Sequence, residues 1–86
     1  MQKAWTDDAW ADYVHWQTED KKILKRVNLL LREIDRNPFS GIGKPGPLKG
    51  NNQGYWSNRI DEANRIVYKV EHEQIVITQC GGHYDE

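Results

Sequence analysis

The feature that most restricts the fold is an apolar stripe with helical spacing in the first half of the chain. Its members are Ile23, Leu24, Val27, Leu30, Leu31 and Ile34. This spacing predicts an amphipathic helix whose apolar face is wide enough to pack against a sheet. We expect the helix to begin between Thr18 and Asp20. It should end by Asn37, because the residue before a proline, here Pro38, disfavours the helical region.

A shorter helix is predicted ahead of the stripe. Thr6 followed by Asp7 and Asp8 is typical of a helix N-cap with acidic residues in the first turn. The face that we expect to be apolar carries Trp10, Tyr13, Val14 and Gln17. We also expect Trp5 and Trp10 to be core residues, because large aromatic side chains dominate the cores of small domains.

Residues 37–54 are rich in glycine and proline, and we expect them to form one long ordered loop. Beyond this loop the spacing of apolar residues changes to a period of two. Residues 55–60, 65–70 and 75–80 are rich in β-branched and aromatic side chains, with short polar connections between them. They predict three antiparallel strands, and residues 1–5 could add a fourth. The predicted fold is a single α+β domain over residues 1–86, in the order β-α-α-β-β-β. Two N-terminal helices pack on one face of a small, mainly antiparallel sheet, whose other face stays open for a ligand or partner.

The charges are unevenly distributed along the chain. The formal net charge is −1, which by itself argues against a nucleic-acid binder. Residues 21–49, however, hold eight basic residues and two acidic ones, between two acidic ends. A solvated helix face is the commoner explanation of such a run taken alone. The pattern also permits local contact with a polyanion such as RNA.

Several functional classes are disfavoured. Cys80 is the only cysteine, so no internal disulfide can form, and its place in a predicted strand indicates a small buried residue rather than a nucleophile. His15, His72 and His83 lack metal-ligand spacing, and we expect neither a metal site nor a cofactor. No apolar run approaches the roughly 20 residues of a membrane span. We therefore expect a cytoplasmic protein that does not associate with membranes.

Two arginines near a predicted hairpin are candidates for chemistry. Arg59 and Arg65 flank a four-residue loop, so they are expected to face each other on neighbouring strands. Two nearby cations repel unless an anion bridges them, which makes a phosphate site one explanation. Pairing with Asp61 or Glu62 at the surface is the other, and the sequence leaves both open.

Other candidates lie in the long loop and at the chain end. Lys44 and Lys49 belong to a loop whose glycines let the backbone approach a ligand. His83 follows two glycines just past the last predicted strand, where a catalytic role and an ordinary surface histidine are equally open. The aromatic residues whose role, core or base stacking, composition does not decide are Tyr55, Trp56 and Tyr84.

Several blocks of residues, in the same order, resemble the YoeB/Txe family of bacterial toxins. They are Trp5-Thr6-Asp7-Asp8-Ala9-Trp10, Asn37-Pro38-Phe39, Gly43-Lys44-Pro45, Pro47-Leu48-Lys49, Trp56-Ser57, Asn64-Arg65-Ile66-Val67-Tyr68 and His83-Tyr84. The resemblance spans nearly the whole chain and implies the fold of the RelE-like, microbial ribonuclease-type toxins. It also implies a toxin of a type II toxin–antitoxin system, a metal-independent endoribonuclease that cuts mRNA on the translating ribosome and so inhibits translation. The implied partners are an antitoxin of the YefM/Phd type, the ribosome with its mRNA, and a second copy of the chain.

The resemblance also assigns roles to individual residues. His83 would be the general acid and Arg65 the main stabiliser of charge on the phosphate. Lys49, Arg59 and Lys44 would bind RNA, and Tyr84 would position or stack on a base.

Two positions depart from the family pattern. The family carries a glutamate as general base where this chain has Gly46, and a basic residue is usual where it has Gly81. Loss of a positioned base commonly costs on the order of 10²–10⁴ in rate. The resemblance therefore predicts a weakened variant, with Gly46 marking the position of the missing base. Two other functions stay open, a non-catalytic module that binds an antitoxin and a ParE-like gyrase inhibitor, although the His83-Tyr84 end speaks against the second.

Overall fold

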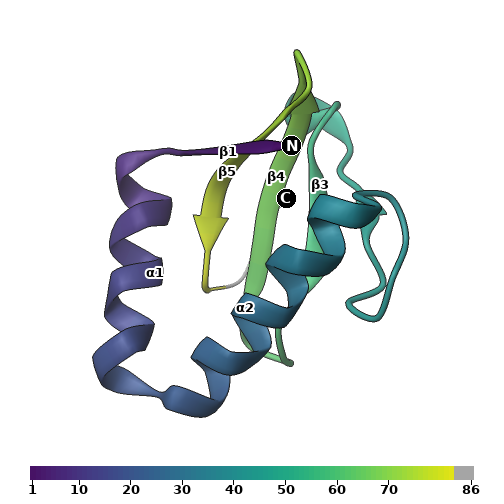
Figure 1. Ribbon diagram of the computed structural model, residues 1–86. Helices are drawn as coiled ribbons and strands as arrows, with labels where there is room; N and C mark the ends of the chain where they lie inside the picture. Colours follow the sequence, from purple (N-terminus) through teal and green to yellow (C-terminus); the bar gives the residue numbers. More distant parts are fainter. Residues whose placement is uncertain (83–86) are drawn as a thin grey trace.

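The computed structural model describes residues 1–82, and its elements follow the predicted order with two additions, a short strand and a 3₁₀ turn in the long loop. In chain order they are β1 (Gln2–Trp5), α1 (Asp7–Glu19), α2 (Lys21–Arg36), β2 (Gly46–Pro47), the 3₁₀ turn η1 (Gly50–Asn52), β3 (Trp56–Arg59), β4 (Arg65–Glu71) and β5 (Gln74–Cys80). The strands form one sheet in the order β1-β5-β4-β3-β2, in which β1 runs parallel to β5 and the other pairs are antiparallel (Figure 1). The predicted α+β fold is confirmed. Within residues 1–82, no helix is both long enough and apolar enough to cross a membrane.

Helix α1 begins after the predicted cap Thr6, and α2 begins at the end of the predicted range, after Asp20. The Thr6 hydroxyl accepts a hydrogen bond from the Ala9 amide at 3.2 Å. The Asp20 carboxylate accepts from the amides of Lys22 and Ile23 at 3.0 and 3.2 Å. These side chains satisfy amides that a helix leaves unpaired in its first turn. Asp20, with an extended backbone, is both the last cap of α1 and the first cap of α2, so it marks the change of direction between the two helices.

The core lies between the helices and one face of the sheet. The stripe of α2 supplies its buried residues Val27, Leu30, Leu31 and Ile34, as predicted. From the sheet, the core receives Ile60, Ile66, Tyr68, Ile75, Ile77 and Cys80. Because side chains alternate along a strand, these residues leave the intervening positions of β3 and β4 on the opposite face.

The face predicted for α1 was wrong for Trp10, Val14 and Gln17, which are exposed, and right for Tyr13, which packs against the core. Trp10 and Val14 are 51% and 46% exposed, whereas Ala9 is fully buried and Trp16 packs against the core. Trp10 lies at the rim, where its ring contacts those of Trp5 and Tyr13 at centroid distances of 5.6 and 5.8 Å. Helix α1 has apolar residues on several sides and no single apolar stripe. Helical spacing alone therefore did not identify the buried side of the helix.

The long loop is ordered and contains a strand that the sequence did not predict. β2 has two residues, one of them proline, and this is too short for a period of two to be seen. Gly43 holds the loop against β3, since its carbonyl accepts a hydrogen bond from the Arg59 amide at 2.9 Å. A Cβ at residue 43 would lie 1.4 Å from Oδ1 of Asn58 and 2.9 Å from Cδ2 of Leu30. Only glycine fits here, and this close approach brings the loop to the edge of the open face.

Candidate functional site

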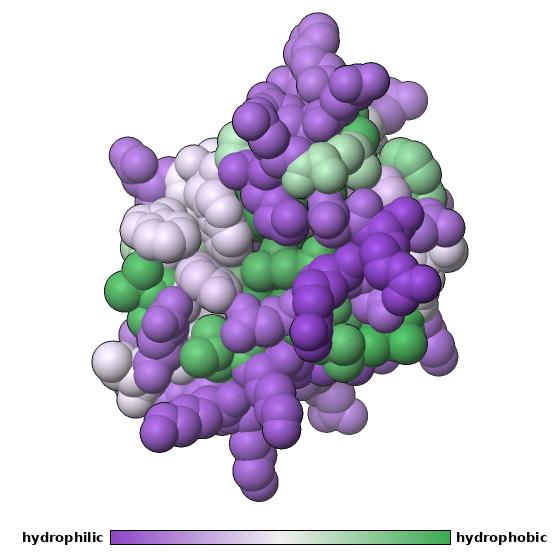
Figure 2. Space-filling view, viewed as in Figure 1, coloured by the Kyte–Doolittle hydropathy of each residue, from purple (hydrophilic) through white to green (hydrophobic). Residues whose placement is uncertain are grey.

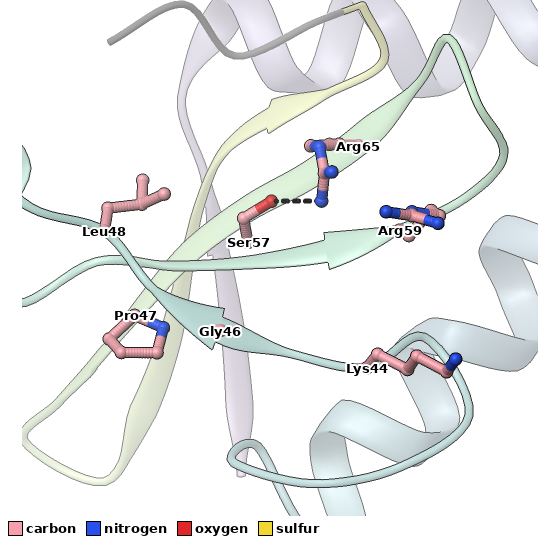
Figure 3. Close-up of a pocket in the computed structure, with 7 residues that line it drawn as sticks. All are labelled: Lys44, Gly46, Pro47, Leu48, Ser57, Arg59 and Arg65. Atoms are coloured by element: carbon pink, nitrogen blue, oxygen red, sulfur yellow. Dashed lines mark hydrogen bonds between the residues drawn. The ribbon is translucent and has the colours of Figure 1, made fainter.

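A cationic pocket of about 430 Å³ lies on the face of the sheet opposite the helices. Its lining residues are Lys44, Gly46, Pro47, Leu48, Ser57, Arg59 and Arg65 (Figure 3). They come from the long loop and from β2, β3 and β4. Gly46 of β2 is the register partner of Ser57 in β3, which in turn is the partner of Val67 in β4. Directly paired residues share a face of the sheet, so these strands together form the floor of the pocket.

Arg59 and Arg65 face each other across β3 and β4, as predicted. Nη1 of Arg65 donates a hydrogen bond to Oγ of Ser57 at 3.2 Å, which directs the guanidinium along the pocket floor (Figure 3). Ser57 is 6% exposed, so its hydroxyl is a fixed acceptor. Like charges placed directly opposite each other on a sheet are unfavourable. The arrangement therefore favours an anion between the two guanidinium groups.

Among the residues that the structure describes, Arg59 and Arg65 do not form ion pairs with Asp61 or Glu62. Within residues 1–82, the salt bridges join the N-terminus and Lys3 to Asp35 and Lys69 to Glu71, and none involves a pocket cation. The Asp61 carboxylate instead closes the turn between β3 and β4, accepting from the Ala63 amide at 2.8 Å and from the Asn64 side chain at 3.1 Å.

The two loop lysines are placed differently. Lys44 lies at the pocket, with a φ of 52° that the turn ahead of β2 imposes. Lys49 is exposed and precedes η1, and it is absent from the pocket lining. The structure therefore brings Lys44, Arg59 and Arg65 together, while Lys49 lies further along the same loop.

Gly46 lies in the pocket and has open space beside it. A Cβ built on Gly46 meets nothing within 4 Å. Since Gly46 pairs with Ser57, a side chain at residue 46 would enter the pocket on the face that carries the Arg65 guanidinium. A side chain at residue 46 could therefore begin without displacing any other group.

Gly82, the last residue that the structure describes, is hydrogen-bonded to the Arg65 end of β4. The Arg65 amide donates to the Gly82 carbonyl at 3.0 Å, and the Gly82 amide donates to Oδ1 of Asn64 at 2.8 Å. Nε2 of Gln79 donates to the carbonyls of Gly81 and Gly82 at 2.7 and 3.1 Å. His83 and Tyr84 lie outside the described residues, but His83 directly follows Gly82 in the sequence.

Helix α1 holds the last residue of β5, Cys80, through two hydrogen bonds. Nε1 of Trp16 donates to the Cys80 carbonyl at 2.8 Å, and the Asp12 carboxylate accepts from the Cys80 amide at 3.2 Å. Gly81 follows with a φ of 154°, and a Cβ there would lie 3.1 Å from the Trp16 ring. A side chain at residue 81 would therefore press on the Trp16 indole, and residue 81 is not part of the pocket lining.

Cys80 is fully buried, as predicted. Burial, and to a smaller extent the charge of Asp12, raises the pKa of its thiol to about 12. The thiol therefore stays protonated and unreactive at neutral pH. Within residues 1–82, no three His, Cys, Asp or Glu side chains are grouped closely enough to hold a metal ion.

Sequence reasoning missed Ser57 and Asn64. Ser57 lies two residues before Arg59 in the same strand, and this spacing places both on one face, so the period of two could have found it. Asn64 carries no such signal, because its contact with Gly82 depends on the register between β4 and the end of β5.

Residues 5–84 match the model of the YoeB-like toxins of bacterial type II toxin–antitoxin systems. Together with the fold and the cationic pocket, this match defines the chain as a toxin of that class. The Toxin YoeB of Streptomyces coelicolor is 51% identical over 84 residues, which cover 98% of this chain and 100% of the relative. The chain belongs to the YoeB family.

Solved structures of the family have the same fold. A YoeB/ParE toxin from Agrobacterium tumefaciens superposes with a TM-score of 0.94 at 43% identity, covering 98% of this chain and 100% of the other. A YoeB from Staphylococcus aureus, solved as a dimer and in a heterotetrameric YoeB–YefM toxin–antitoxin complex, superposes with a TM-score of 0.89 at 44% identity over 98% of each chain.

Proposed function

We propose that this toxin is a metal-independent endoribonuclease that cuts mRNA on the ribosome, and that Gly46 weakens its activity. The observation that carries the proposal is the pocket in which Lys44, Arg59 and Arg65 converge with no acidic ion-pair partner among residues 1–82. A phosphodiester supplies the anion that such a pocket lacks.

In the proposed reaction, the ribose 2′-oxygen attacks the adjacent phosphorus and the bond from phosphorus to the 5′-oxygen breaks. The products are a 2′,3′-cyclic phosphate and a free 5′-hydroxyl. A base must take the proton of the 2′-hydroxyl, and an acid must give a proton to the leaving 5′-oxygen. Arg65, held by Ser57, and Arg59 stabilise the extra negative charge that develops on the phosphate oxygens.

We assign the acid to His83 and a positioning or stacking role to Tyr84, as the family resemblance implies. The hydrogen bond from the Arg65 amide to Gly82 supports this assignment, because it ties the residue just before His83 to the strand end that carries Arg65. Lys44 and Lys49 would contact the RNA backbone on either side of the scissile bond.

Gly46 has no side chain that could act as the base. The 2′-hydroxyl proton would then pass to solvent, at a cost on the order of 10²–10⁴ in rate. The empty space at Gly46 supports this explanation, because the pocket has room for the missing carboxylate.

The proposed partners are the ribosome with its mRNA, a second copy of the chain, and an antitoxin of the YefM type. The last two are found with the Staphylococcus aureus relative. An antitoxin segment that orders on binding and covers the cationic pocket would block access of RNA. Action on ribosomes places the proposed activity in the cytoplasm.

The test is primer extension on a message translated in the presence of the chain, its Gly46→Glu variant and its Gly46→Gln variant. Glutamine has the shape of glutamate but is not a base. We expect Gly46→Glu to raise cleavage by on the order of 10²–10⁴, Gly46→Gln to give no gain, and Gly46→Glu/His83→Ala to lose the gain. An equal gain from glutamine, or none from glutamate, would contradict the proposed role of residue 46.

The absence of a base at Gly46 also favours a second candidate, a toxin-like module that binds an antitoxin without turnover. That function predicts antitoxin binding and no cleavage by the Gly46→Glu variant. The gyrase-inhibitor alternative predicts a change in DNA supercoiling by gyrase, and unaffected supercoiling would exclude it.

A further inference from the structure

A second basic surface lies on the exposed side of α2. It consists of Lys22, Lys25, Arg26 and Arg32 around Leu29, and these residues line a shallow hollow of about 440 Å³; we call it the α2 basic face. Figure 2, seen from the same side as Figure 1, shows strongly hydrophilic side chains over α2 with apolar ones between them. The five residues fall at spacings of three and four, so they form one stripe about 15 Å long.

The stability of the helix does not explain this stripe. In the described part of the chain, none of its cations forms an ion pair with an acidic side chain. Lys22 is in the first turn of α2, where the helix dipole favours acidic residues, and this turn contains none. Lys22 and Arg26 are also four residues apart, a spacing at which like charges destabilise a helix. Arg26 alone has a structural contact, since its Nε donates to the Ile60 carbonyl at 3.3 Å.

The stripe is also separate from the pocket of the proposed reaction. The residues of α2 that face the sheet, Val27, Leu30, Leu31 and Ile34, occupy the opposite side of the helix. The pocket lies beyond the sheet, on the face that the helices do not cover. One RNA strand in the pocket therefore cannot also contact the α2 basic face without passing around the domain.

We propose that the α2 basic face binds the phosphate backbone of base-paired RNA, at a site distinct from the one that holds the cleaved strand. Charge complementarity carries the choice of partner, because four unpaired cations surround a single apolar residue. An acidic amphipathic helix would need several apolar anchor points in the groove, and Leu29 is the only one there. A duplex backbone needs cations at intervals along one line, which the stripe supplies.

The test measures binding of the unmodified protein to an RNA hairpin with a stem of about 16 base pairs, by fluorescence anisotropy over a range of salt concentrations. The variant is Lys25→Gln/Arg32→Gln, which leaves the Arg26 contact intact. A control of equal net charge is Gln2→Glu/Gln17→Glu, at exposed positions outside the stripe. We expect the α2 variant to bind roughly five- to tenfold more weakly. Its plot of log affinity against log salt should be less steep by about 2, whereas the control should match the parent.

Equal weakening by the control would overturn the proposal, because net charge would then explain the binding. So would an unchanged affinity of the α2 variant, or a loss seen for an acidic peptide and not for the hairpin. The outcome is independent of the cleavage chemistry. Arg65→Gln should abolish cleavage by the Gly46→Glu form and leave hairpin binding intact, so failure of either proposal can be told from failure of the other.

Discussion

Gly43 is the position at which we expect one added methyl group to disturb this protein most. Its carbonyl accepts the Arg59 amide hydrogen bond, and the Asn58 side chain occupies the place that a Cβ at residue 43 would take. The perturbation is Gly43→Ala. The new Cβ would lie 1.4 Å from Oδ1 and 2.5 Å from Cγ of Asn58, and 2.9 Å from Cδ2 of Leu30.

The expected cost follows from what must move. Asn58 is 2% exposed and Leu30 is fully buried, so neither side chain can swing into solvent. Overpacking of a core typically costs about 1–3 kcal/mol. If the loop moves instead, the Arg59–Gly43 hydrogen bond is lost at about 1 kcal/mol. Either way we expect a loss of about 1–3 kcal/mol in the free energy of unfolding, which for a domain of this size lowers Tm by about 4–24 °C.

The assay is urea denaturation followed by circular dichroism, with Gly46→Ala as the matched control. Both glycines belong to the same loop, but a Cβ at residue 46 meets nothing within 4 Å. The control should stay within about 0.5 kcal/mol of the parent. If Gly43→Ala and Gly46→Ala destabilise the protein equally, or if neither does, the reasoning that the loop is held by contact at Gly43 is refuted.

Three further predictions concern the site and its support. In the Gly46→Glu background, Ser57→Ala should lower the rate of single-turnover cleavage about tenfold, because the charged hydrogen bond that orients Arg65 is lost. Ser57→Thr keeps the hydroxyl and should keep most of the rate. If Ser57→Ala cleaved as fast as the Gly46→Glu form alone, the role of Ser57 would be contradicted. Trp16→Phe removes the hydrogen bond to the Cys80 carbonyl and should cost about 1 kcal/mol of unfolding free energy in urea, and an unchanged midpoint would count against the supporting role of α1. Burial raises the pKa values of Tyr68 and Cys80 to about 12, so the unfolded chain loses these protons at a lower pH than the folded protein does. The free energy of unfolding should therefore be constant below about pH 9 and fall from there toward pH 12. The fall should be less steep for Tyr68→Phe. A flat profile across that window would show that these groups titrate normally in the folded state.

The sequence predicted the elements whose signals are local. The α2 stripe, the cap Thr6, and the alternation along β4 and β5 each depend on neighbours a few residues apart. The phase of α1 and the strand β2 were missed because each is decided by tertiary contacts. The Trp16 indole faces the core because it donates a hydrogen bond to the Cys80 carbonyl, which is distant in sequence. β2 is defined by the pairing of Gly46 with Ser57 in β3, and no local pattern indicates that pairing.

The candidate site followed the same division. The pairing of Arg59 with Arg65 was predictable, because a short hairpin fixes which residues face each other. The contact of Gly82 with Asn64 and Arg65 was not, since it joins residues brought together only by the finished sheet. The roles of His83 and Tyr84, given by resemblance alone, stay predictions, as does the base role at residue 46.

The two loop glycines separate the stability of the fold from the chemistry of the site. A Cβ at Gly43 would overlap the Asn58 side chain, whereas a Cβ at Gly46, three residues later in the cationic pocket, would meet nothing within 4 Å. We therefore expect a carboxylate side chain at residue 46, the proposed position of the base, to cost little in folding. Under the proposed function, this is how a chain would keep the pocket and the arginine pair while lacking the base. It also predicts that Gly46→Glu, unlike most substitutions into a folded core, changes the rate of cleavage far more than the free energy of unfolding.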